Sequence, residues 1–170
     1  MHQGVTDWVS RWLPAEVRTV VDVGGRNING TAHQAFTGCR YDRWVVVDVR
    51  DDLRPDHADE FHVADFTDWV CPYPDVDVVL CTETFEHCPW EPIVYKSWKV
   101  LASYGKAIFT TVTPAFPPHS AEDGKQLRDG EYYEGVDPDR LERVMEHAGF
   151  APLIEVNGAF LNAAGGKLLR

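Results

Sequence analysis

The sequence predicts an α/β fold with a mostly parallel sheet, and three observations carry this prediction. Helical and strand patterns alternate along the 170 residues, with no repeat or polar linker between them. Residues 17–24 (VRTVVDVG) and 44–49 (WVVVDV) are continuous β-branched runs, as expected for strands that are covered on both faces. Near the end, Asn157-Gly158 lies between two apolar runs, so the sheet is expected to close with an antiparallel hairpin.

The N-terminal half is expected to supply one helix and four strands. Pro14 ends an apolar stripe with helical spacing, which predicts an N-terminal helix within residues 1–14. The stripe consists of Val5, Trp8, Val9, Trp12 and Leu13. The strands at 17–24 and 44–49 are followed by a weaker one at 61–64 and a fourth at 76–81.

The C-terminal half continues the alternation. A helix is predicted at 91–101 and a strand at 106–112. The clearest helix is 137–148, because Asp137 is a natural N-cap and Pro138 suits the first helical position.

The predicted hairpin pairs residues 153–156 with residues 159–162, which makes seven strands within one domain, 1–170. Residues 114–136 break the alternation, since they are rich in Pro, Gly and charge and show no periodicity. Long loops of this kind in compact domains are usually functional or disordered. We expect residues 114–136 to act as a lid or substrate loop.

Composition excludes several function classes. The 16 Lys and Arg residues against 27 Asp and Glu give a formal charge of -11, and no basic cluster indicates a nucleic-acid partner. No signal peptide and no apolar run of about 18 residues is present, so no membrane partner is expected. The four cysteines form no C-x-x-C pair, and a reducing, cytoplasmic setting is expected. The acidic balance favours a small-molecule partner.

The first strand ends in a glycine-rich turn. Asp22 is followed by Gly24 and Gly25 in the run VVDVGGRNING. Glycines suit a turn where a ligand approaches the backbone, because a Cβ would block it. Open α/β sheets bind ligands at the carboxyl ends of their strands. This turn is therefore a candidate ligand site.

Carboxylates also follow the second and third strands. Asp48 lies 26 residues after Asp22 and could accept both hydroxyls of a ribose. Asp65 could accept a hydrogen bond from an adenine amino group, and the neighbouring Phe66 could cover the ring face. One acidic residue at the end of each successive strand indicates a nucleotide-like ligand.

The ordered set of motifs resembles class I S-adenosylmethionine-dependent methyltransferases, and the type 11 group in particular. The matching segments are Asp22-Val-Gly24-Gly25, Asp48, Ala64-Asp65, residues 81–87 (CTETFEH) and residues 146–150 (EHAGF). The resemblance covers about residues 17–162. It implies a doubly wound, seven-stranded Rossmann-like fold, S-adenosyl-L-methionine as cofactor, and methyl transfer to a small-molecule, sugar or natural-product acceptor.

The resemblance also implies roles for individual residues. Asp22, Gly24 and Gly25 would face the methionine moiety, Asp48 the ribose, Asp65 and Phe66 the adenine, and Thr82 and Glu83 the sulfonium side. Two departures from the family pattern stand out. The glycines do not follow G-x-G-x-G, and residues 50–60 are too short and too rich in Pro and Asp for a helix. One face of the sheet could thus be thinly covered and completed by a second copy in a homodimer.

Candidate catalytic residues are His119 and His87. An oxygen acceptor needs a base, and a histidine titrates near neutral pH, whereas a neutral amine needs little beyond positioning. His119 is favoured because His87 lies in what reads as a packed turn before Pro89. No metal is expected, since Glu83-Thr-Phe-Glu86-His87 lacks the first histidine of H-x-x-E-H.

Two alternatives stay open. One is a non-enzymatic module that binds S-adenosylmethionine or S-adenosylhomocysteine on a methyltransferase-like fold, because fold alone does not guarantee activity. The other is an NAD-dependent oxidoreductase, although the loop lacks G-x-G-x-x-G spacing and the terminal hairpin does not suit that class. The methyl acceptor and the oligomeric state do not follow from the sequence.

Overall fold

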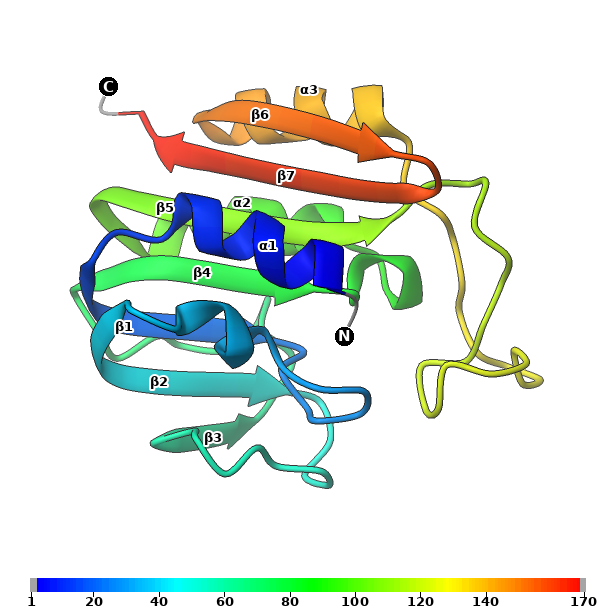
Figure 1. Ribbon diagram of the computed structural model, residues 1–170, viewed down its shortest axis with the longest axis horizontal. Helices are drawn as coiled ribbons and strands as arrows, with labels where there is room; N and C mark the ends of the chain where they lie inside the picture. Colours follow the sequence, from blue (N-terminus) through cyan, green and yellow to red (C-terminus); the bar gives the residue numbers. More distant parts are fainter. Residues whose placement is uncertain (1–2, 169–170) are drawn as a thin grey trace.

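A computed structural model describes residues 3–168 and contains one seven-stranded sheet (Figure 1). The strands lie in the order β3-β2-β1-β4-β5-β7-β6. Their bounds are β1 Glu16–Val23, β2 Arg40–Asp48, β3 Glu60–Val63, β4 Val76–Thr82, β5 Leu101–Val112, β6 Phe150–Asn157 and β7 Phe160–Lys167.

Strands β1 to β5 pair in parallel, and β7 lies antiparallel to both β5 and β6. The order reverses between β1 and β4, because the chain first builds outward through β2 and β3 and then returns to the other side of β1. The predicted doubly wound sheet with its antiparallel C-terminal hairpin is confirmed. A ligand site is expected at the reversal.

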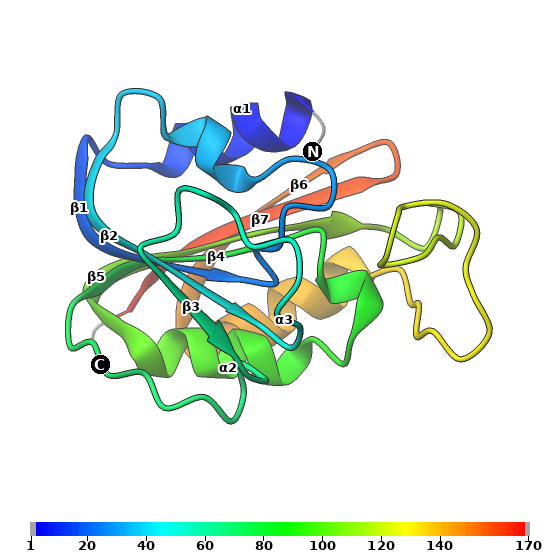
Figure 2. The same ribbon diagram turned by 90° about the horizontal axis from the view of Figure 1, so that it is seen from below.

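Helices cover both faces of the sheet (Figure 2). Helix α1 (Gln3–Trp12) and the 3-10 helix η1 (Ala32–Phe36) lie on one face, and α2 (Glu91–Val100) and α3 (Pro138–Ala148) lie on the other. Alternate residues of a strand enter opposite cores. Val21 and Val45 pack on the α2 side, and Val20 and Trp44 pack on the α1 side. This two-sided burial explains the continuous β-branched runs.

Helix α3 forms where its capping signals predict it. The Asp137 side chain accepts a hydrogen bond from the Arg140 backbone N–H at 2.8 Å, and Pro138 follows at the first helical position. Gly149 ends the helix with a φ of 106°, a left-handed conformation that favours glycine. Leu141 and Met145 bury the apolar face.

Several predicted boundaries are wrong. Strands β6 and β7 extend beyond the predicted 153–156 and 159–162, because they pair with each other as far as Phe150 and Lys167. Strand β2 begins four residues early at Arg40, because the polar residues before Trp44 pair with the start of β1. Strand β5 begins at Leu101, because Leu101 pairs with Val76 before a register shift. The preceding helix therefore ends at Val100, one residue before its predicted end.

The hairpin turn is shifted by one residue from its prediction. Asn157 pairs with Phe160, so the two turn residues are Gly158 and Ala159. Gly158 has a φ of 62°, as the first position of a type II′ turn requires.

The long loop of residues 114–136 forms neither helix nor strand, but hydrogen bonds and an ion pair anchor it to the rest of the fold. Its C-terminal end is held by backbone hydrogen bonds from Val136 N to Val112 O and from Glu134 N to Glu86 O, at 2.8 and 2.9 Å. Its middle forms an ion pair between Glu122 and Arg50, which follows β2. The predicted loop of residues 114–136 thus leans over the carboxyl edge of the sheet (Figure 1).

As expected, residues 49–59 between β2 and β3 contain no helix. Within residues 3–168, none of the helices combines the length and the apolar composition that crossing a bilayer requires. All four cysteines lie in this range and are free thiols.

Candidate functional site

Two adjoining cavities open where the strand order reverses, at the carboxyl ends of β1, β2 and β4. They have volumes of about 210 Å³ and 350 Å³. Six residues line both cavities: Gly24, Arg26, Ile28, Glu83, His87 and Ala121. The smaller cavity is bounded on its outer side by the long loop, and the larger one extends toward β2 and β3.

Asp22 lies at the inner wall of the smaller cavity and is only 1% exposed. Burial raises the pKa of its carboxyl to about 7, and the nearby Trp44 indole offsets part of that rise. Neither carboxylate oxygen forms a hydrogen bond of normal geometry among the described residues. A buried carboxylate of this kind is set to receive a donor or a cation from a ligand.

The two glycines after Asp22 are required by close packing. A Cβ on Gly25 would lie 2.6 Å from the carboxyl carbon of Asp22. A Cβ on Gly24, whose φ is 71°, would collide with Oγ1 of Thr84. The glycines thus bring the turn against β1 and the residues after β4, which leaves the cavity beside Asp22 open.

Asp48 ends β2 in the larger cavity, and the structure pairs it with a residue that the sequence did not single out. Nε of Arg26 lies 3.1 Å from Oδ1 of Asp48, and the Arg26 side chain is only 8% exposed. The backbone N–H of Arg50 donates to the same oxygen at 3.0 Å. Burial raises the pKa of Asp48, and its contacts with Arg50 and Arg26 oppose that rise.

Asp65 and Phe66 both line the larger cavity, but in different ways. Asp65 is exposed, and its Oδ1 accepts hydrogen bonds from the backbone N–H and hydroxyl of Thr67 at 2.8 and 2.7 Å. Phe66 is 3% exposed and stacks on Trp69. Phe66 therefore forms part of the apolar floor, and Asp65 stands at the rim.

Thr82 and Glu83 connect β4 to the smaller cavity. Glu83 has a φ of 53°, an uncommon backbone conformation for a residue with a side chain. Its N–H donates to Thr110 O at 2.8 Å, and its Oε1 accepts from the Thr110 hydroxyl at 3.0 Å. Strand β5 thus holds Glu83 facing both cavities.

The two candidate catalytic histidines meet although they are distant in sequence. His87 ends the short helix η2 (Phe85–His87), and His119 lies in the long loop. Their ring centroids are 4.9 Å apart and nearly perpendicular, and Tyr133 contacts both rings. Burial and, to a smaller extent, the neighbouring His119 lower the pKa of His87 to about 4.

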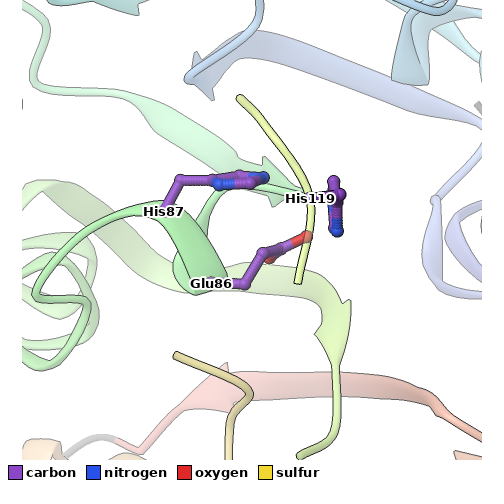
Figure 3. A group of neighbouring side chains, drawn as sticks. All are labelled: Glu86, His87 and His119. Carbon is purple, nitrogen blue, oxygen red and sulfur yellow. The ribbon is translucent and has the colours of Figure 1, made fainter. Parts of the chain in front are cut away.

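Glu86 completes this group (Figure 3). Donor atoms of Glu86, His87 and His119 all lie within 4.8 Å of one another. Burial and the charge of Glu83 raise the pKa of Glu86 to about 8.

The sequence analysis assigned no role to Glu86 or Arg26. Glu86 belongs to the noted run E-T-F-E-H, and Arg26 directly follows the glycine pair, so both had a local signal.

Comparison with solved structures places the chain among methyltransferases in fold. An S-adenosylmethionine-dependent methyltransferase from Mesorhizobium loti matches with a TM-score of 0.70 and 14% identity, over 95% of this chain and 98% of that one. A Haloferax volcanii protein described as a putative methyltransferase, in complex with the Trm112 methyltransferase activator, matches with a TM-score of 0.72 and 14% identity, over 99% of this chain and 90% of that one.

A third match is phosphoethanolamine N-methyltransferase 2 of Haemonchus contortus in complex with S-adenosyl-L-methionine. It has a TM-score of 0.71 and 12% identity over 98% of this chain, which spans 52% of that protein. No protein-family model and no curated protein sequence matches this chain. The structural likeness shows that the chain has the class I methyltransferase fold.

Proposed function

We propose, from this fold and from the cavities at its topological switch point, that the protein binds S-adenosyl-L-methionine and transfers its methyl group to a small-molecule acceptor. One observation carries the proposal. Asp22 is buried beside a cavity with both carboxylate oxygens lacking normal hydrogen bonds among the described residues, and the glycines beside it keep that cavity open. The α-ammonium group of the cofactor would supply the missing donor.

The larger cavity suits the nucleoside part of the cofactor. Its walls combine apolar groups such as Val47, Phe66 and Ile93 with the carboxylates of Asp48 and Asp65. Apolar walls with few polar groups are typical of small-ligand sites. We assign Asp48 to the ribose and Asp65 with Phe66 to the adenine. A ribose would share Asp48 with the Arg26 guanidinium.

The two cavities meet beside Glu83, so a cofactor spanning both would bring its sulfonium there. A sulfonium is cationic, and the carboxylates of Glu83 and Asp22 create a negative field that favours it. When bound, the cofactor supplies an activated methyl group. The chain would then contribute alignment of donor and acceptor, with Thr82 and Glu83 at the inner wall.

The acceptor would enter from the side of the long loop. His119 and Ser120 line the smaller cavity on the side of the long loop, and that side would be left for the acceptor when the methionine part of the cofactor lies beside Asp22. For an oxygen acceptor, we assign the base role to His119 in the protein without bound metal. His87 is less suited, because its pKa of about 4 makes it a weak base at neutral pH.

A binding module without activity is the second candidate, and the Arg26–Asp48 ion pair favours it. A guanidinium already held on Oδ1 of Asp48 would compete with a ribose for that oxygen. In that case the protein would bind the adenosyl ligand without transferring a methyl group.

Calorimetric titration with S-adenosylmethionine, S-adenosylhomocysteine and NAD tests the cofactor, and an acceptor panel then tests transfer. Binding of both adenosyl compounds and none of NAD is expected. NAD binding without adenosyl binding would overturn the proposal. Binding with no transfer to any acceptor would support the binding module.

The oligomeric state belongs to the same proposal. Val49, Leu53 and Val63 are exposed near the β3 edge. The connection from β2 to β3 contains no helix that could cover them. A homodimer that covers this edge stays a prediction, and sedimentation measurements would test it.

A further inference from the structure

Glu86, His87 and His119 form a cluster beside the smaller cavity that the proposed methyl transfer does not use in full. Two of its members come from η2 and the third comes from the long loop, as Figure 3 shows. One donor atom from each lies within 4.8 Å of the others. The cluster is therefore a product of tertiary folding, and its chemistry has to be judged from its contacts.

Glu86 is the buried member, with 0% of its surface exposed. The Thr111 hydroxyl donates to its Oε2 at 2.7 Å, which fixes the carboxylate. Its other oxygen, Oε1, is shielded from solvent and has no hydrogen-bond partner among the described residues. A buried carboxylate oxygen without a donor is destabilising unless a proton or a cation satisfies it.

His87 presents a second unsatisfied atom. Its Nδ1 is buried and forms no hydrogen bond of normal geometry within residues 3–168, while the Tyr132 backbone carbonyl interacts with the same imidazole. A backbone carbonyl beside the ring is the kind of partner that metal-binding histidines commonly have. His119 approaches from the loop, with its ring nearly perpendicular to that of His87.

We propose that Glu86, His87 and His119 bind one divalent transition-metal cation, with Zn²⁺ as the best match to the donor set. Two imidazoles and one carboxylate are the ligands that zinc prefers, whereas magnesium and calcium prefer oxygen atoms alone. The proposal stands on the convergence of the three donors and on the buried atoms that lack partners.

The three donor atoms would reach the separations found around a bound zinc ion after a small movement toward one another. Ligand atoms about 2.0–2.2 Å from a tetrahedral zinc are about 3.3 Å apart, so the cluster must contract by up to roughly 1.5 Å. His119 can supply this movement, because it lies in the loop and not in a helix or strand. The charges of Glu83 and Glu131, which act on Glu86 and His87, add to the attraction for a cation.

Three protein ligands leave one coordination position open, as in catalytic zinc sites. His87 and His119 both line the smaller cavity, so the open position would face the proposed acceptor. A cation there would orient an acceptor oxygen, and His119 would then be a ligand and not a free base. This role rests on the proposed methyl transfer, whereas metal binding itself does not.

Calorimetric titration of the untagged, metal-stripped full chain with Zn²⁺ tests the site. The wild-type protein is expected to bind one Zn²⁺ per chain. His119→Asn and Glu86→Gln should each weaken that binding by about 100-fold or more, a larger loss than outer-shell changes produce. His147→Asn is the matched control, since His147 lies in α3 outside the cluster, and it should bind as wild type.

Stoichiometric binding that both cluster variants lose would support the site. Absence of one-to-one binding, or equal affinity in wild type and in the cluster variants, would overturn it. Titration of the same variants with S-adenosylhomocysteine separates the two proposals. Loss of zinc with retained adenosyl binding supports the metal site independently, and zinc binding without any adenosyl binding would contradict only the proposed methyl transfer.

Discussion

Replacing Asp22 by Asn should abolish a pH dependence that we expect in the binding of S-adenosylhomocysteine. In the ligand-free protein, burial raises the pKa of Asp22 to about 7, so the carboxyl is mostly protonated in mildly acidic solution. The ammonium group of the ligand would pair with the ionised form. Binding should therefore release a proton below pH 7 and strengthen as the pH rises.

The size of the effect follows from the pKa. With a free-protein pKa of about 7, roughly 1% of the protein has ionised Asp22 at pH 5 and roughly 90% at pH 8. If the ligand lowers the pKa to well below 5, affinity should rise by about 90-fold between these two pH values. At pH 6, about 0.9 proton should be released for each ligand bound.

Calorimetry in two buffers of different ionisation enthalpy measures both quantities. The amide that replaces the carboxyl in the variant carries no titrating proton, so Asp22→Asn should flatten the affinity profile and remove that release. A flat wild-type profile, or an equal slope in the variant, would refute the assignment of Asp22 to the ligand ammonium.

The same carboxyl links pH to folding stability. Its folded pKa lies above the ordinary value of 3.8, so its contribution to stability is fully present below pH 3.8 and is lost as the pH rises through about 7. Without ligand, Asp22→Asn should therefore be more stable than wild type at pH 8 by about 1–4 kcal/mol. Denaturant unfolding at pH 4 and pH 8 checks this, and equal differences at both would contradict it.

Asp48→Ala should weaken S-adenosylhomocysteine binding by about 1–3 kcal/mol in calorimetry, because the ribose hydroxyls lose a buried acceptor. Unchanged affinity would contradict the assignment of Asp48 to the ribose. Gly24→Ala should cost about 1–3 kcal/mol more stability than Gly158→Ala in thermal unfolding. Both positions have positive φ, but only the first Cβ would collide with a neighbour, the Thr84 side chain, so equal losses would speak against the packing argument. A short Gly/Ser linker in place of residues 117–132 should reduce turnover far more than cofactor affinity, and equal losses in a folded variant would reject the acceptor-wall role.

Much of the fold could be predicted because its signals are local. Strands β1 and β2 are buried on both faces, so their sequences are continuous apolar runs. Asp137 and Gly149 mark the two ends of α3. Asp22 and Asp48 could also be identified from the sequence as candidate cofactor-binding residues. Parallel strands bring their carboxyl ends to one edge, so residues at those ends meet whatever the loops do. Boundaries such as the start of β5 were missed because pairing with β4 extended the strand past its apolar run.

Only the tertiary structure decided what surrounds those residues. Arg26 lies on Asp48, and His119 meets His87 and Glu86, because the loops fold back over the sheet edge. The contacts that hold the long loop, from Glu122 to Arg50 and from Glu134 to Glu86, join segments far apart in the chain. Such contacts leave no periodic pattern, since their energy comes from ion pairs and hydrogen bonds that form only when the chain folds. The chain by itself determined where the candidate site lies, and the packing of its loops determined which charges face its cavities.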